Sequence, residues 1–458
     1  MERGVPDEIV EFFTTPGNYA LLVKGKPGTG KTIFSLECLK EFADEGCGFY
    51  FSTRVDPDAL LKQYPHVKEY LPHQNIIDAV RTPIPHTAGL HEILNYASIP
   101  DFLRGLYDHV SKLGSERNIV VVVDSLDAVC EVLDYPMQKF MHTFSDFVRK
   151  MGIKSIIVTE HETVTKLDYL TDGVVRLDYE LIDGRLYREM YIEKLRAVKI
   201  RNPVIPFSLK DGRFTLPKRF KFPSPETIMS KINRTMRMLS STQRNDRTFS
   251  TGSMSLDGAI GKFYSSNFVF YEVLRYVPAG VLMGLISLQV LGLLAKNVPV
   301  LLIPARYGSE EVIVNMIVTY LGKNALDRIK LLVPRTFDRN KFIQEFLNIT
   351  SNLRRYNRRI GIIFATDALE STFGKDGGPL IGSQIIVEGR RHGDLIIAFS
   401  HESSMTREIF RDMADRVITL FGKHGYVFLY GTKPKTPIYN VYSDEQFDIL
   451  DLGLLEIV

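Results

Sequence analysis

The stretch Gly25-Lys26-Pro27-Gly28-Thr29-Gly30-Lys31-Thr32 has the pattern G-x-x-x-x-G-K-[ST] of a phosphate-binding P-loop. The apolar run 19–23 before it predicts a buried strand, and residues 33–43 after it have the spacing of an amphipathic helix. In such a unit, backbone N–H groups of the glycine loop and the helix N-terminus surround a polyphosphate. Lys31 is then expected to reach the β- and γ-phosphates, and the Thr32 hydroxyl to hold Mg²⁺. The alternative is a glycine-rich turn that binds nothing.

Length and composition indicate an ordinary globular protein of several domains. The chain has 458 residues, 45% of them hydrophobic and 24% charged. A net charge of +3 is too small to indicate nucleic-acid binding by itself. Cys38, Cys47 and Cys130 have no metal-ligand spacing, so we expect buried small residues in a reducing, cytoplasmic compartment.

One uncharged run, residues 276–295, is long enough to cross a bilayer. It contains Pro278 and Gly280, and a second apolar run follows it at 298–303. A core helix that leads into a core strand explains both runs, so a membrane span is not favoured.

Strands and helices alternate through the first half, which is typical of an α/β fold with a mostly parallel sheet. The β-branched run 119–123 fits the centre of such a sheet, buried on both faces. Asp124 follows it and has the position of a Walker B aspartate, whose carboxylate would hold Mg²⁺ opposite Thr32. The alternative is an N-cap for the next helix. Ligands of parallel sheets bind at the carboxyl ends of the strands.

The second half repeats the order of the first. Residues 156–162, which end in Glu160-His161-Glu162, resemble 396–402, which end in Ser400-His401-Glu402. In the same comparison Asp124 is matched with Asp367. The second copy of the P-loop then falls on residues 273–280, which lack the lysine and most of the glycines, so we expect no nucleotide there.

The repeat predicts three segments. Residues 1–212 would form an ATP-binding domain, 213–248 a basic linker, and 249–458 a degenerate domain without a P-loop.

Three groups of residues resemble the KaiC-like branch of the RecA superfamily of P-loop ATPases. They are the P-loop itself, the segment 171–175 with 193–196 after it, and Phe249-Ser250-Thr251-Gly252 with Leu256-Asp257-Gly258. With two tandem RecA-like domains, one of them degenerate, the chain looks most like the archaeal gas-vesicle regulators of the GvpD type. The resemblance implies ATP and Mg²⁺ as cofactors and a homo-oligomer, often a hexameric ring.

The resemblance also implies a role for Lys194 and Arg196. They match a K-x-R motif that, in KaiC-like proteins, reaches the nucleotide of a neighbouring subunit. The alternative is a solvated basic pair on a strand.

The chain departs from this family at the position of the catalytic glutamates, which reads Arg54-Val55. Arginine cannot accept a proton at neutral pH, and loss of a general base costs roughly 10²–10⁴-fold in rate. Asp56 is close enough to substitute in part, and Arg54 would instead stabilise charge on the γ-phosphate. The expected catalytic set is Lys31, Arg54, Asp56 and Asp124, with slow turnover.

Basic residues gather between Arg213 and Arg247 and between Arg354 and Arg359. GvpD-like proteins carry arginine-rich regions tied to repression of a partner. A solvated linker with a helix terminus is the alternative, and nucleic-acid phosphates are another, although no interleaved aromatic residues support base stacking.

The leading hypothesis is an ATP-binding regulatory protein, a slow ATPase switch that acts through a protein partner. The alternatives are a DNA-binding recombinase-like paralogue and an enzyme whose ATPase drives remodelling.

Overall fold

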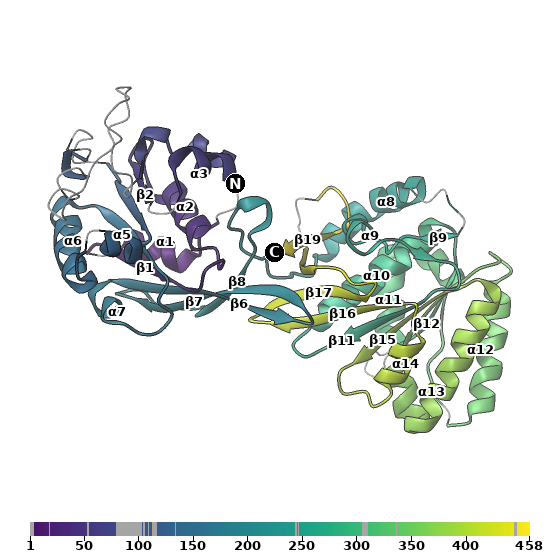
Figure 1. Ribbon diagram of the computed structural model, residues 1–458. Helices are drawn as coiled ribbons and strands as arrows, with labels where there is room; N and C mark the ends of the chain where they lie inside the picture. The colour runs from purple at the N-terminus through teal and green to yellow at the C-terminus, as the bar shows by residue number, and fades with distance from the viewer. Residues whose placement is uncertain are drawn as a thin grey trace. The chain divides into compact units, whose positions relative to one another are not determined.

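The chain divides into two compact units (Figure 1). The computed structural model describes residues 4–458 except 18, 53–54, 79–102, 104–105, 109, 112–116, 133, 243–244, 246, 305–309, 336 and 444–446. Unit 1 comprises Met1–Pro217 with Ile457–Val458, and unit 2 comprises Lys218–Glu456.

Unit 1 is built on an eight-stranded sheet in the order β3-β2-β4-β5-β1-β6-β7-β8. The first six strands of this order are parallel, and β7 and β8 continue the sheet in antiparallel pairing. The strands are β1 (Ala20–Lys24), β2 (Gly48–Ser52), β3 (Ile76–Asp78), β4 (Val120–Asp124), β5 (Lys154–Thr159), β6 (Gly173–Ile182), β7 (Arg185–Leu195) and β8 (Val204–Phe207). The expected mostly parallel α/β fold is confirmed.

Helices cover both faces of this sheet because its central strands are apolar on both sides. Val120 and Val122 of β4 pack in one core with helix residues such as Phe34, while Val121 and Val123 pack in the other with residues such as Phe140. The helices of unit 1 are α1 (Asp7–Thr14), α2 (Lys31–Phe42), α3 (Pro57–Gln63), α5 (Leu126–Val132), α6 (Met137–Met151) and α7 (Lys166–Leu170), with 3₁₀ turns η1 (Pro65–Glu69), η2 (His73–Asn75) and η3 (Lys210–Gly212).

Unit 2 contains a nine-stranded sheet in the order β13-β12-β14-β15-β11-β16-β17-β18-β19. Its strands are β11 (Phe268–Val273), β12 (Val300–Ile303), β13 (Ile329–Leu331), β14 (Gly361–Ala365), β15 (Leu395–His401), β16 (Arg416–Lys423), β17 (Tyr426–Lys433), β18 (Ile438–Ser443) and β19 (Leu452–Ile457), besides the separate pair β9 (Thr248–Phe249) and β10 (Phe263–Tyr264). Its helices are α8 (Pro225–Thr242), α9 (Met254–Ile260), α10 (Ala279–Ala295), α11 (Glu310–Leu321), α12 (Arg339–Leu353), α13 (Thr366–His392) and α14 (Arg407–Met413), with the 3₁₀ turn η4 (Lys323–Asp327).

The two sheets share one strand order, since β3-β2-β4-β5-β1-β6-β7 corresponds to β13-β12-β14-β15-β11-β16-β17. The register aligns them residue by residue. β4 pairs with β5 from Val120 and β14 pairs with β15 from Gly361, so Asp124 at the end of β4 corresponds to Ala365 at the end of β14. The two expected domains are therefore two α/β units of one topology.

This register corrects two residue matches made from the sequence. Asp367 lies two positions beyond the counterpart of Asp124, in the first turn of α13. His161 corresponds to Glu402 and not to His401, because Ser155 beside β1 and Ile396 beside β11 occupy equivalent positions. The sequence comparison aligned similar residues next to the strand ends. The register is fixed by the pairing of the strands, which the sequence does not show.

The structure also differs from the sequence prediction in the segment 213–248. Residues Pro225–Thr242 form α8, whose Ile228, Ile232 and Leu239 pack with Leu291 and other residues of unit 2. A helix with one apolar stripe and one basic face therefore occupies much of the predicted linker.

Most of the uncharged run 276–295 lies in α10 (Ala279–Ala295), a helix of 17 residues that is followed by the core strand β12. Among the described helices, none combines the length and the hydropathy that a bilayer span requires.

Candidate functional site

The P-loop lies between β1 and α2, at the carboxyl end of the parallel strands. Gly25, Gly28 and Gly30 have φ angles of 149°, 80° and 99°, a region that side chains with a Cβ rarely adopt. A Cβ at Gly25 would lie 2.3 Å from the carbonyl oxygen of Leu177. At Gly28 a Cβ would meet no atom within 4 Å, so the loop leaves open space at that point. The glycines are thus required by the shape of the loop.

Lys31 is the first residue of α2 and is only 8% exposed. Its ammonium group donates to the carbonyl oxygens of Gly25 at 2.6 Å and Lys26 at 2.8 Å. The loop therefore surrounds its own lysine, and the positive charge is held where the loop backbone and the helix N-terminus converge. A cation in this place suits a bound phosphate.

Thr32 and Asp124 meet across the site. The Thr32 hydroxyl donates to Oδ2 of Asp124 at 2.6 Å, so the two expected Mg²⁺ ligands lie side by side. A hydroxyl and a carboxylate are the hard oxygen donors that Mg²⁺ prefers. Among the described residues, no group of three or more His, Cys, Asp or Glu side chains could hold a metal ion. A metal ion here would therefore depend on phosphate oxygens for its remaining ligands.

Tyr50 belongs to the same cluster and was not singled out in the sequence. This β2 residue is 2% exposed, and its hydroxyl donates to the same Asp124 oxygen at 2.5 Å. Burial, followed by the neighbouring Asp124 charge, raises the pKa of Tyr50 well above its usual range. Burial, followed by the Asp124 charge, also raises the pKa of Tyr64. Tyrosine in an apolar strand reads as core, so only the fold identifies its contact.

The two remaining members of the expected catalytic set are less defined. Asp56 is the N-cap of α3 and accepts a hydrogen bond from the backbone N–H of Ala59 at 2.9 Å. Arg54 lies outside the described residues.

The loop after β5 contacts both the P-loop and the helix after β4. Lys26 lies 3.6 Å from a carboxylate oxygen of Glu162. His161 lies 3.1 Å from Asp127, which also accepts the backbone N–H of Glu160. Because β5 neighbours β1 in the sheet, this loop flanks the phosphate site.

Lys194 and Arg196 are held by partners within unit 1. Lys194 donates to the backbone carbonyls of Asp168 and Thr171 at 2.7 Å and 2.6 Å, and burial lowers its pKa. Arg196 pairs with Asp172 at 2.6 Å, although half of its side chain is exposed. Both residues lie where β7 pairs with the beginning of β6, whereas the P-loop follows the end of β1. The structure does not bring them to the P-loop of their own chain.

A buried charge beneath the P-loop is reversed between the two units. Lys24, at the end of β1, forms ion pairs with Asp168 at 2.6 Å and Glu193 at 2.8 Å. Its counterpart in β11 is Glu272, which lies 3.7 Å from Arg407 and 3.5 Å from Arg411. Each sheet thus buries one charge at this position and surrounds it with the opposite sign.

Unit 2 has lost every polar member of the site. In the shared register, Lys31 corresponds to Ala279 and Thr32 to Gly280, since α2 and α10 begin at equivalent residues. Tyr50 corresponds to Leu302, and Asp124 to Ala365. This supports the prediction that the second domain binds no nucleotide.

The two basic regions differ in how their side chains are used. Arg354 is largely buried and pairs with the fully buried Asp394 at 2.6 Å, so it serves the core of unit 2. Arg234 and Arg237 lie on the exposed face of α8, and Arg234 pairs with exposed Asp448. These contacts suit the solvated-helix alternative at least as well as a phosphate-binding surface.

Comparison with known proteins agrees with this geometry. Residues 9–193 match the family described as GvpD gas vesicle protein, P-loop domain. Protein GvpD2 of Halobacterium salinarum is 29% identical over 335 residues, which cover 70% of this chain and 65% of the relative. Protein GvpD1 of the same organism is 26% identical over 333 residues, which cover 70% of this chain and 60% of that relative.

A second group of relatives matches a shorter part of the chain. A UPF0273 protein of Pyrobaculum aerophilum is 24% identical over 224 residues, which cover 45% of this chain and 77% of that protein. The chain spans less than two thirds of the length of the two GvpD proteins it matches. The resemblance to GvpD and its relatives is thus confirmed, and residues 9–193 match the P-loop domain of the GvpD gas vesicle protein family.

Proposed function

We propose that the chain is an ATP-binding regulatory protein of the GvpD type, a slow ATPase switch that acts through a protein partner. The observation that carries this proposal is the cluster of Lys31, Thr32, Tyr50 and Asp124, which unit 1 possesses and unit 2 has replaced with apolar or small residues. One nucleotide site in two similar domains suits a protein that reads a nucleotide state.

The residues fit Mg-ATP. Lys31 would balance phosphate charge, and the loop N–H groups with the α2 N-terminus would orient the phosphates. Thr32 and Asp124 would hold Mg²⁺, which supplies charge neutralisation at the phosphates when bound.

Slow turnover is part of the proposal because Arg54-Val55 stands at the position where the family resemblance places the catalytic glutamates. Asp124 is committed to the metal position, and Asp56 caps α3. Asp127 is occupied by His161 and by the backbone of Glu160. Without a base, hydrolysis loses roughly 10²–10⁴-fold, which would leave the ATP-bound state long-lived enough to be recognised.

The experiment measures Mg-ATP affinity and turnover on the same preparation of the full chain. We expect saturable binding that Lys31→Ala removes, together with turnover far below that of motor ATPases. Arg391→Ala, at an exposed arginine of α13 in unit 2, is the control and should change neither. Rapid turnover that vanishes in Arg54→Ala would refute the switch, and absence of Mg-ATP binding would refute the whole proposal.

We also propose self-association, with Lys194 and Arg196 contacting the nucleotide of a neighbouring subunit. Their separation from the P-loop of their own chain supports a contact in trans. Light scattering with and without Mg-ATP tests it. An Arg196→Gln variant should bind ATP as tightly as wild type when dilute and more weakly when associated, whereas equal weakening in both regimes would contradict the contact.

A further inference from the structure

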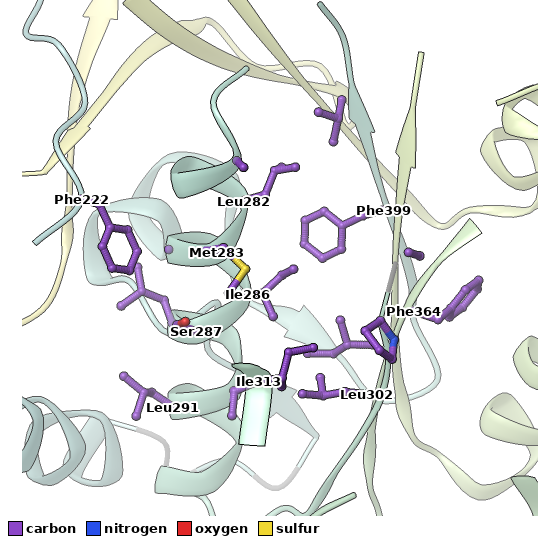
Figure 2. Close-up of a pocket in the computed structure, with 18 of the residues that line it drawn as sticks. Phe222, Leu282, Met283, Ile286, Ser287, Leu291, Leu302, Ile313, Phe364 and Phe399 are labelled. Atoms are coloured by element: carbon purple, nitrogen blue, oxygen red, sulfur yellow. The ribbon is translucent and has the colours of Figure 1, made fainter. Parts of the chain in front are cut away.

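The described residues of unit 2 line a large, partly open apolar cavity, with a volume of about 1250 Å³. One wall is α10, which contributes Leu282 and Ile286 (Figure 2). The facing wall comes from the carboxyl ends of β12, β14 and β15, with Leu302, Ala365 and Phe399. This is the edge of the sheet at which unit 1 carries its P-loop.

The cavity exists because the residues at the nucleotide-site positions of unit 2 have smaller side chains than their counterparts in unit 1. Ala279, Leu302 and Ala365 line it, and they stand where unit 1 has Lys31, Tyr50 and Asp124. Each replacement removes a polar or charged group, and each is smaller than the residue that it replaces. Space is left, but the ammonium and the metal ligands that would hold a polyphosphate are gone. Transfer of a charged phosphate into such a site is unfavourable without partners.

The former phosphate loop is also engaged in other contacts. Tyr276 takes the left-handed φ of 63° at the position of Gly28. Next to it, Arg275 forms an ion pair with Glu402. These two residues stand where the P-loop of unit 1 has Pro27 and Gly28, so the loop of unit 2 is not a vacant phosphate site.

The shape of the cavity selects a flexible occupant. Figure 2 shows Phe222 on one side of α10 and Phe399 on the other, with Leu282, Met283 and Ile286 of the helix between them. The cavity therefore passes around α10 and does not form a straight trough. A peptide helix is about 10–12 Å across and straight, so it would not follow this path, whereas a hydrocarbon chain bends at every bond.

The apolar residues of α10 that face the cavity are not fully covered. Leu282, Met283 and Ile286 are only partly buried, although the first half of this helix contains no charged residue. Burial of such surface by an apolar ligand is favourable in proportion to its area.

We propose that this degenerate nucleotide site binds a molecule with one long flexible hydrocarbon chain. The chemistry is shared by fatty acyl and isoprenoid chains. The duplicated fold would then carry two sites of different class at equivalent places, one for Mg-ATP and one for an apolar chain. The lipid site does not depend on the P-loop of unit 1.

The test uses the full chain and cis-parinaric acid, a fluorescent long-chain fatty acid. We expect saturable binding that is displaced by palmitate or by the isoprenoid alcohol geranylgeraniol, and the stronger competitor identifies the chain class. Ala365→Phe fills the cavity and should weaken binding at least tenfold. Leu380→Phe is the matched control, because Leu380 is 57% exposed on α13 and lies outside the cavity wall, and it should bind as wild type does.

Two further measurements make the outcome decisive. Lys31→Ala should lose Mg-ATP binding and keep the fatty acid, which separates this proposal from the function proposed for unit 1. A photoreactive fatty acid on the wild-type chain should label peptides from α10 or β14, which requires no folded variant. Absence of saturable binding, equal affinity in a folded Ala365→Phe variant, or labelling confined to other segments would overturn the proposal.

Discussion

Removal of one buried hydroxyl at the metal position is the most direct test of the site geometry. Tyr50→Phe deletes the donor that contacts Asp124 and leaves the ring in the core of unit 1. A hydrogen bond to a charged group contributes about 1.5–3 kcal/mol. Thr32 still donates to the same oxygen, so we take the lower end, about 1.5 kcal/mol. If the carboxylate must then be ordered when Mg²⁺ binds, this energy corresponds to about a tenfold change in affinity.

The assay is binding of a fluorescent ATP analogue over a Mg²⁺ titration, with a chelator series beside it. We expect Tyr50→Phe to require about tenfold more Mg²⁺ for half-saturation, while metal-free nucleotide binding changes little. Tyr187→Phe is the control, because Tyr187 is a fully buried tyrosine of β7 in the same sheet. The reasoning is refuted if the Mg²⁺ dependence of Tyr50→Phe overlaps that of wild type, or if Tyr187→Phe shifts it equally.

Three further outcomes are expected. Lys24→Met should lower the free energy of unfolding by about 3–5 kcal/mol at neutral pH, because it leaves the largely buried carboxylate of Asp168 without its cation, whereas Glu193 keeps Arg176. Lys68→Met, at an exposed lysine, is the control in urea unfolding. This difference should shrink as the pH falls below about 4. Burial opposes the shift, but the hydrogen bonds from Lys24 and Thr165 and the charge of Lys24 together outweigh it and lower the pKa of Asp168. The stabilisation is therefore present above the unfolded-state pKa and is lost on protonation, and a pH-independent difference would contradict the assignment. Arg354→Gln should destabilise unit 2 by a similar amount, about 3–5 kcal/mol, and Arg237→Gln by less than about 0.5 kcal/mol. If Arg237→Gln instead abolished salt-sensitive DNA binding, the α8 face would be a nucleic-acid surface.

The parts of the fold and site that sequence reasoning recovered are those with local determinants. The P-loop is contiguous, and its strand and helix follow from periodicity, so residues 25–32 lie where the pattern put them. Asp124 was found because a β-branched run ends directly at it. The alternation of strands and helices was sufficient for the parallel sheets.

The parts that were missed depend on contacts across the sheet. Tyr50 contacts Asp124 from a strand 74 residues away in sequence, and nothing next to it in the chain marks that contact. Asp367 was matched with Asp124 by similarity of letters, whereas the pairing of β14 with β15 gives Ala365. The α8 helix was hidden by its basic residues, although Ile228 and Ile232 already had helical spacing. The apolar cavity depends on how α10 packs against the sheet, and its small lining residues are recognised only once the strand register is known.

The reversed charge at Lys24 and Glu272 has a consequence for how a duplicated chain assembles. Two sheets with one strand order in one polypeptide could exchange their central strands during folding. If β11 took the place of β1, Glu272 would be buried beside Asp168 and Glu193; in the opposite exchange Lys24 would be buried beside two arginines. Like charges in a low-dielectric interior repel strongly, so both misassembled products are penalised. The opposite buried charges therefore favour assembly of each strand into its own sheet over exchange between the two sheets.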